Sequence, residues 1–142
     1  MQADVLRLAP GDDLRLALEA RYRELMLTQG VEAACVVSAV GSLSTAVLRY
    51  AGQPQGTPID GALEIVSLSG TLSADGPHLH AAVADAQGHV RGGHVLAGCT
   101  VRTTAEIVLA LLPGWSFRRA PDARTGYAEL VATPPPVWRD KP

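Results

Sequence analysis

One segment, from Gly76 to His94, holds all four histidines of the chain and is typical of a β-hairpin. In a β-strand, residues two apart point to the same face. His78 and His80 are therefore expected to share one face of the first strand of this hairpin. Their spacing is that of metal ligands, so the segment constrains both the local fold and the candidate chemistry.

The loop of the predicted hairpin decides which histidines meet. If residues 86–88 form a three-residue loop, Gly88 takes the positive φ that this loop class requires at its last position. Counting back along the two strands then places His80 directly opposite His94. A two-residue loop would shift the pairing by one residue and turn His94 to the other face. The position of Gly88 favours the three-residue loop.

On that register three histidines, His78, His80 and His94, converge on one face and form a candidate metal site. Three neutral imidazoles with an open fourth position suit zinc or another divalent metal of borderline softness. Such a metal can activate a bound water or polarise a carbonyl or phosphate oxygen. The alternative is that these are ordinary polar strand residues. His89 is interpreted as a surface residue beside the turn, paired with Asp85.

Four further residues are candidates for orienting the metal ligands or lining a ligand pocket: Glu64, Glu106, Arg49 and Asp85. Glu64 lies inside an apolar strand, where an unpaired carboxylate is costly. It is expected to accept a hydrogen bond from a histidine ring, to pair with Arg49, or to be exposed. Glu106 has the same alternatives, and it would act as a fourth ligand or a general base if it reached the metal.

A chain of 142 residues with 47% apolar and 18% charged residues is typical of one globular domain. We expect this domain to cover residues 1–133, followed by a proline-rich tail at 134–142. No apolar run is long enough for a membrane span, and charged residues interrupt the N-terminal stretch that a signal peptide would need. A cytoplasmic location without membrane contact is expected, with Cys35 and Cys99 as buried free thiols.

The charge of the chain bears on nucleic-acid binding. The net charge is −2, Lys141 is the only lysine, and the arginines are scattered. Proteins that hold duplex DNA usually carry a basic patch that displaces counterions from phosphates. No such patch is visible in the sequence, although an oligomer could gather Arg91, Arg118 or Arg119 around its axis.

The pattern along the chain predicts one helix among several strands. The helix begins at Asp12 or Asp13, ends at Gly30, and carries an apolar stripe at spacings of three and four. Gly41-Ser42 is either a turn between two strands or a bulge in one continuous strand. Beside the hairpin, strands are predicted at 5–8, 33–40, 44–51, 62–72 and 127–132, with 115–117 short and extended and 100–112 fitting either a strand or a helix.

Six stretches occur in the order and spacing of a known family: Ser38–Leu43, Leu48–Tyr50, Leu63–Thr71, the histidine hairpin, Val101–Glu106 and Thr125–Leu130. They resemble the plant-and-prokaryote-conserved (PPC) domain over nearly the whole chain. The resemblance implies an α/β (α+β) fold, in which one main N-terminal helix packs on a largely antiparallel β-sheet. It also implies that 100–112 is a strand and that the protein assembles as a homotrimer.

The same resemblance carries two functional labels. Prokaryotic members are often described as DNA-binding, and some are similar to metal-containing proteins through this histidine set. In plants the domain follows AT-hook motifs that bind the minor groove. The core of this motif is Arg-Gly-Arg-Pro, and the 142 residues do not contain it, so they include no AT-hook.

Three functions from different classes remain open at this point. The first is a regulatory or DNA-associated PPC protein, and the second is a metal-dependent enzyme acting on an unknown small molecule. The third is a scaffold stabilised by a closed metal site. An open coordination position in a cleft would favour the enzyme, whereas a fourth protein ligand would favour the scaffold.

Overall fold

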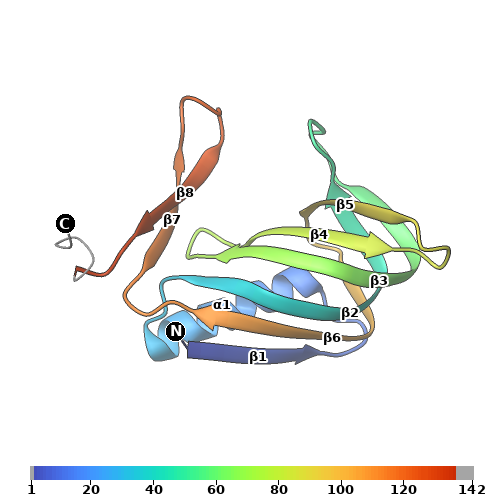
Figure 1. The fold of residues 1–142 in the computed structure, drawn as a ribbon, viewed down its shortest axis with the longest axis horizontal. Helices are drawn as coiled ribbons and strands as arrows, with labels where there is room; N and C mark the ends of the chain where they lie inside the picture. The colour runs from blue at the N-terminus through green and yellow to red at the C-terminus, as the bar shows by residue number, and fades with distance from the viewer. Residues whose placement is uncertain (1, 137–142) are drawn as a thin grey trace.

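In the computed structural model, which describes residues 2–136, one helix packs against a curved antiparallel sheet (Figure 1). The α+β architecture expected from the sequence is therefore confirmed. In chain order the elements are β1 (Gln2–Leu8), α1 (Leu14–Gln29), β2 (Ala34–Arg49), β3 (Thr57–Leu72), β4 (His78–Ala84), β5 (Val90–Val95), β6 (Thr100–Leu111), β7 (Ser116–Pro121) and β8 (Ala128–Thr133).

Helix α1 begins and ends where the sequence predicts. Asp13 caps its N-terminus, because one carboxylate oxygen accepts a hydrogen bond from the backbone N–H of Leu16 at 3.0 Å. Gly30 ends the helix in the left-handed conformation, with φ of 66°. The predicted apolar stripe packs on the sheet, and its buried members are Leu14, Leu18, Tyr22 and Leu25.

The strands of the main sheet follow the order β1-β6-β2-β3-β4-β5, and β5 also pairs with the end of β2. The sheet thus curls until β2, β3, β4 and β5 enclose part of the core. The closing pairs are Leu48 with Val95 and Arg49 with His94. This closure brings residues from the end of β2 beside the histidine hairpin, although the hairpin lies far along the chain.

The two halves of β2 form one continuous strand with a bulge, which settles the alternative left open by the sequence. Its pairing with β6 shifts register between Gly41 and Leu43. At Gly41, with φ of 150°, a Cβ atom would lie 2.2 Å from the carbonyl oxygen of Thr104. Residues 100–111 are a strand, as the family resemblance implied.

The last two strands, β7 and β8, form a separate antiparallel hairpin (Figure 1). Strand β7 is longer than the short extended segment predicted at 115–117, because it pairs with β8 along its whole length. The backbone N–H of Arg119 donates to a carboxylate oxygen of Asp75 at 2.8 Å, which ties the hairpin to the loop before β4. Residues 137–142 of the predicted tail lie outside the described part of the chain.

The free thiol predicted at Cys99 is buried, and Cys35 is partly buried. Within residues 2–136, α1 is too short and too polar to cross a membrane, and the structure contains no helix there that could do so.

Candidate metal centre

The β4–β5 hairpin has the three-residue loop predicted from Gly88. The backbone N–H of Gly88 donates to the carbonyl of Asp85 at 2.9 Å, and that of Asp85 donates to the carbonyl of His89 at 3.0 Å. Gly88 has φ of 81°, the conformation that this loop requires. His80 pairs directly with His94, so the predicted register is confirmed.

A row of directly paired residues crosses four strands at the candidate site. Arg49 of β2 pairs with His94 of β5. His94 pairs in turn with His80 of β4, and His80 pairs with Ser69 of β3. Directly opposed residues of antiparallel strands point to the same face, with Cβ atoms about 4.5–5.5 Å apart. The two histidines therefore lie between a cationic side chain and a hydroxyl.

His78 completes the cluster from the position two residues before His80, beside Thr71 of β3. The three ring centroids lie 5.1–5.6 Å apart. One nitrogen from each ring lies within 4.8 Å of the other two. Tetrahedral zinc with bonds of about 2.0–2.1 Å separates its ligand nitrogens by about 3.3 Å, so modest rotations of the rings would bring them to a common ion.

The electrostatic surroundings keep two of the three rings neutral. Burial and then the Arg49 guanidinium lower the pKa of His94 to about 4. Burial and then Arg119 lower the pKa of His78 below its usual value of 6.5. The neutral imidazole is the form that ligates a metal, so at pH 7 these rings need not lose a proton before binding.

His94 also has an atom that lacks a partner. Its Nδ1 is buried and has no hydrogen-bond partner among residues 2–136. A buried polar atom without a partner costs free energy, and native structures usually satisfy it with protein, water or an ion. A divalent metal bound by the three rings would satisfy one ring nitrogen of His94. The donor set and this orphaned atom both fit such an ion.

Two hollows meet at the histidine cluster. A cleft of about 680 Å³ lies beside all three rings, and Arg49, Tyr50 and Tyr127 line its other side. A smaller hollow of about 320 Å³ lies beside His78 and His80. The smaller hollow is bounded by Ser69, Gly70, Thr71, Arg119, Glu129 and Leu130. The cluster is therefore open to small molecules on both sides.

Arg119 of β7 contacts the cluster directly. Its guanidinium nitrogen Nη2 lies against Nδ1 of His78. Glu129, from the neighbouring strand β8, favours the charged form of His78, and Arg119 opposes it. The β7–β8 hairpin thus contributes one cation and one carboxylate to the edge of the site.

Of the four additional candidates named from the sequence, the structure brings only Arg49 to the histidines. Glu64 pairs with Ala84, four residues beyond His80, which places it roughly 13 Å away along the strand. Within residues 2–136 it makes no ion pair with Arg49, and its side chain is exposed. Glu106 is exposed on β6, opposite Arg7. Neither glutamate lines the two hollows.

Asp85 lies in the turn of the hairpin and away from the cluster. Its carboxylate accepts hydrogen bonds from the backbone N–H groups of Gln87 and His89, at 3.0 and 2.9 Å. It also lies 3.4 Å from the His89 ring. The pairing of Asp85 with an exposed His89 is the one expected from the sequence, and it shapes the loop.

No role at the histidine cluster was predicted for Arg119, Glu129, Tyr50 or Tyr127, all of which line the hollows. Three of them lie within the family-like stretches 48–50 and 125–130, and that was the available signal. Arg119 had no comparable signal. Its contact with His78 depends on how the β7–β8 hairpin docks, a tertiary feature that periodicity does not encode.

Residues 1–113 match the family model of the Plants and Prokaryotes Conserved (PCC) domain. The chain belongs to this family. It is the family that the six stretches of the sequence resemble, and the match includes the whole histidine hairpin. Arg119 and the β7–β8 hairpin follow the matched residues.

This PCC domain is similar to proteins of several kinds. A bifunctional protein GlmU from Synechococcus sp. strain JA-3-3Ab is 52% identical over 140 residues, which cover 94% of this chain. The chain spans only 22% of the length of that curated relative. A solved hypothetical protein from Salmonella cholerae-suis is 42% identical, with a TM-score of 0.88 and 94% of each chain covered.

The solved structure of a metal-containing protein from Archaeoglobus fulgidus is 30% identical. Its TM-score is 0.72, and the match covers 92% of this chain and 94% of that one. A structure from Ralstonia eutropha JMP134, described provisionally as a DNA-binding protein, is 24% identical, with a TM-score of 0.73 and 89% of each chain covered. At that identity the likeness shows the fold alone.

Proposed function

We propose that this PCC-domain protein binds a divalent metal, zinc by preference, through His78, His80 and His94. The observation that carries the proposal is the meeting of three imidazoles by strand register beside an open cleft. Three nitrogen donors suit zinc and its neighbours among the divalent metals. The metal-containing relative from Archaeoglobus supports the proposal from an independent direction.

The access that small molecules have to the cluster favours a metal that binds a water or substrate over a purely structural metal. Among the described residues, no fourth histidine, cysteine or carboxylate joins the three rings. A structural zinc site is usually closed by four protein ligands, whereas a catalytic site keeps one position for water or substrate. The cleft beside all three rings leaves room for that position. A metal-dependent enzyme acting on a small molecule is therefore the second candidate function.

In such an enzyme the metal would supply a Lewis acid or an activated water. The residues of this chain have separate roles. The paired strands hold two of the rings side by side, and the closure of β5 on β2 buries His94 beside Arg49, which keeps its ring neutral at pH 7. Arg49 and Arg119 would each place a positive charge near the ion, from the larger and the smaller hollow respectively.

We also propose that the working form is a homotrimer, as the family resemblance implies. Helix α1 covers one face of the sheet and leaves the opposite face open (Figure 1). On β2 and β3, Val37, Val40 and Val66 are 61%, 57% and 57% exposed. Neighbouring copies would remove these side chains from water, which favours association.

DNA association has the weakest support of the proposed roles. The net charge is −2, and Arg49 and Arg119 line the two hollows beside the histidine cluster instead of forming a basic surface stripe. Phosphate contacts supply most of the affinity in non-specific DNA binding, and they weaken steeply with salt. A salt series on a random duplex tests this role, and the absence of binding at low salt would end it.

Elemental analysis of purified protein tests the metal proposal. Wild type and the control His89→Ala should each carry about one zinc-like ion per chain, since His89 lies beside the turn of the hairpin and is not part of the histidine cluster. His80→Ala should lose most of the metal, because two imidazoles bind much more weakly than three. A wild-type protein that stays metal-free after growth and dialysis with zinc would refute the proposal.

A further inference from the structure

The surroundings of the histidine cluster are positively charged. Arg49 lines the larger hollow and Arg119 the smaller one. Among the described residues that line the two hollows, Glu129 is the one carboxylate. A divalent ion on the three rings would raise this local excess further. A concave site with an excess of one charge attracts ligands of the opposite charge.

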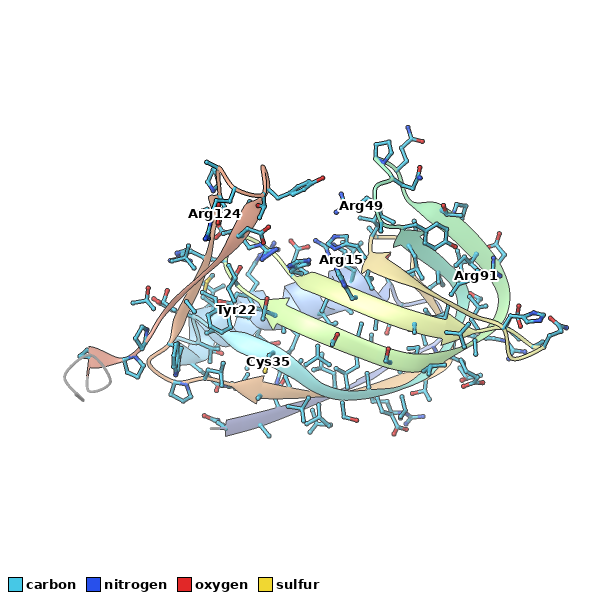
Figure 2. The ribbon with its side chains drawn as sticks, turned by 45° about the horizontal axis from the view of Figure 1, so that its top comes forward. Arg15, Tyr22, Cys35, Arg49, Arg91 and Arg124 are labelled. Atoms are coloured by element: carbon cyan, nitrogen blue, oxygen red, sulfur yellow. The ribbon has the colours of Figure 1, made fainter. Side chains whose placement is uncertain are left out.

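Arg49 has a guanidinium with nothing to neutralise it. Within residues 2–136 this group makes no hydrogen bond or ion pair. Its backbone is fixed, because Arg49 pairs directly with His94. Figure 2 shows the side chain directed from β2 into the space between the β7–β8 hairpin and the loop after β2. A planar donor held in this way suits a carboxylate or phosphate, which it can bind through two parallel hydrogen bonds.

Arg119 contacts His78, and a metal bound to His78 would displace it. Its Nη2 lies against Nδ1 of His78. A neutral imidazole has one lone pair, and the guanidinium can only donate, so their hydrogen bond occupies that lone pair. A metal on His78 needs the same lone pair, either at Nδ1 or, after the ring proton moves, at Nε2. Binding of the metal therefore releases the Arg119 guanidinium beside the ion.

We propose that the cleft binds a small molecule bearing a carboxylate or phosphate group, with its oxyanion on the metal where the two hollows meet, between Arg49 of the larger hollow and Arg119 of the smaller one. This inference builds on the proposed metal site and names the ligand class that the site takes. The cleft of about 680 Å³ lies within the size range of small-molecule pockets. Because the oxyanion binds the metal directly and the metal also frees the Nη2 group of Arg119 from His78, binding of the anion depends on the metal.

The test is isothermal titration of zinc-loaded protein with three probes. Inorganic phosphate and succinate represent the two oxyanion classes, and the neutral diamide of succinic acid is the control of equal shape. Zinc content is measured on each sample before titration. Saturable binding of phosphate or succinate without binding of the diamide is the expected result, and the preferred anion identifies the class.

The variants distinguish a specific role of Arg49 and Arg119 from the general effect of removing one positive charge. Arg49→Gln and Arg119→Gln should each weaken anion binding by about tenfold, the loss of one charge-assisted contact. Arg91→Gln is the matched control, because Arg91 lies on β5 but lines neither hollow, and Figure 2 shows it far from Arg49. It should leave the affinity within twofold of wild type. If one of the two variants fails to fold, the other still decides the matter.

Several results would overturn the inference. Zinc-loaded wild type that binds neither anion would do so while leaving the metal site intact, whereas protein that takes up no zinc refutes the proposed function itself. Equal binding of the neutral diamide, or an equal loss of affinity in Arg91→Gln, would show that Arg49 and Arg119 do not select the ligand. Equally tight anion binding to zinc-free protein would contradict the dependence on metal.

Discussion

At the scale of single residues, charged groups act at two separate sites, the histidine cluster and the contact between β1 and α1. His94 and its neighbour Arg49 define the electrostatics of the histidine cluster. Far from it, Asp4 of β1 holds Arg21 of α1 through two hydrogen bonds of 2.6 and 2.8 Å. The Asp4 side chain is 13% exposed, so solvent screens this pair less than a surface ion pair. The pair fastens the helix to the edge of the sheet.

Asp4→Asn should lower the free energy of unfolding by about 1–2 kcal/mol, because it replaces charge-assisted hydrogen bonds with neutral ones. Urea denaturation at pH 7 measures the loss. Glu24→Gln is the control, since Glu24 binds the same arginine but its side chain is 59% exposed. That variant should stay within about 0.5 kcal/mol of wild type.

The contribution of this pair should depend on pH with a definite sign. Hydrogen bonding to Arg21 lowers the pKa of Asp4 below its ordinary value of 3.8, so the unfolded chain takes up the proton first as the pH falls. The advantage of wild type over Asp4→Asn is therefore complete above about pH 5 and shrinks as the pH drops below about 4. An advantage that stays constant down to pH 3 would contradict this assignment.

At the scale of elements, the site depends on how closely β5 approaches β2. Gly93 lies next to His94, and a Cβ atom at Gly93 would lie 2.7 Å from the carbonyl oxygen of Arg49. That distance is too short for a real Cβ atom, and the obstacle is backbone, which cannot rotate away. The absence of a side chain at this one position lets β5 close on β2 and hold His94 beside Arg49.

Gly93→Ala should therefore destabilise the protein by about 1–3 kcal/mol and weaken zinc binding, because the closing strands must separate. Thermal or urea unfolding and zinc titration measure the two effects. Gly92→Ala is a milder substitution for comparison, since a Cβ atom at Gly92 would lie 3.0 Å from its nearest neighbour, the carbonyl oxygen of Ala81. Its effects should be smaller. A Gly93→Ala protein with wild-type stability and zinc affinity would show that the closure is not what positions His94.

The way the strands pair also explains how much of this site could be predicted from the sequence alone. The hairpin register was predictable because it depends on local rules, namely strand alternation and a positive φ at Gly88. The placement of Arg49 beside His94 required the closure of the sheet, which joins segments far apart in the chain. For Glu64 the sequence left a histidine hydrogen bond, a pair with Arg49 and exposure open, and the structure selects exposure, because Glu64 lies on the face of β3 that is turned to solvent. The docking of Arg119 on His78 had no local signature.

At the scale of the whole molecule, the proposed assembly of three chains is tested by its mass. Sedimentation equilibrium should give a mass about three times the 14.8 kDa of one chain. Val40→Asp should shift the mass towards a single chain, because it places a charge on the face that the proposed assembly buries.

Leu27→Asp is the control for the assembly. Leu27 is 76% exposed but lies on α1, on the other side of the sheet. The variant should therefore keep the mass of wild type. Wild-type protein that sediments as a single chain at micromolar concentration would refute the trimer. It would leave the histidine cluster untouched, because every described member of that cluster comes from one chain.

The proposed metal centre, with three histidines of one hairpin and one open position, can be measured by X-ray absorption at the zinc edge of zinc-loaded protein. The expected shell contains about three imidazole nitrogens at about 2.0–2.1 Å and one oxygen that phosphate or succinate replaces. A shell containing sulfur, a shell without imidazole scattering, or a protein that retains no zinc for the measurement would contradict it.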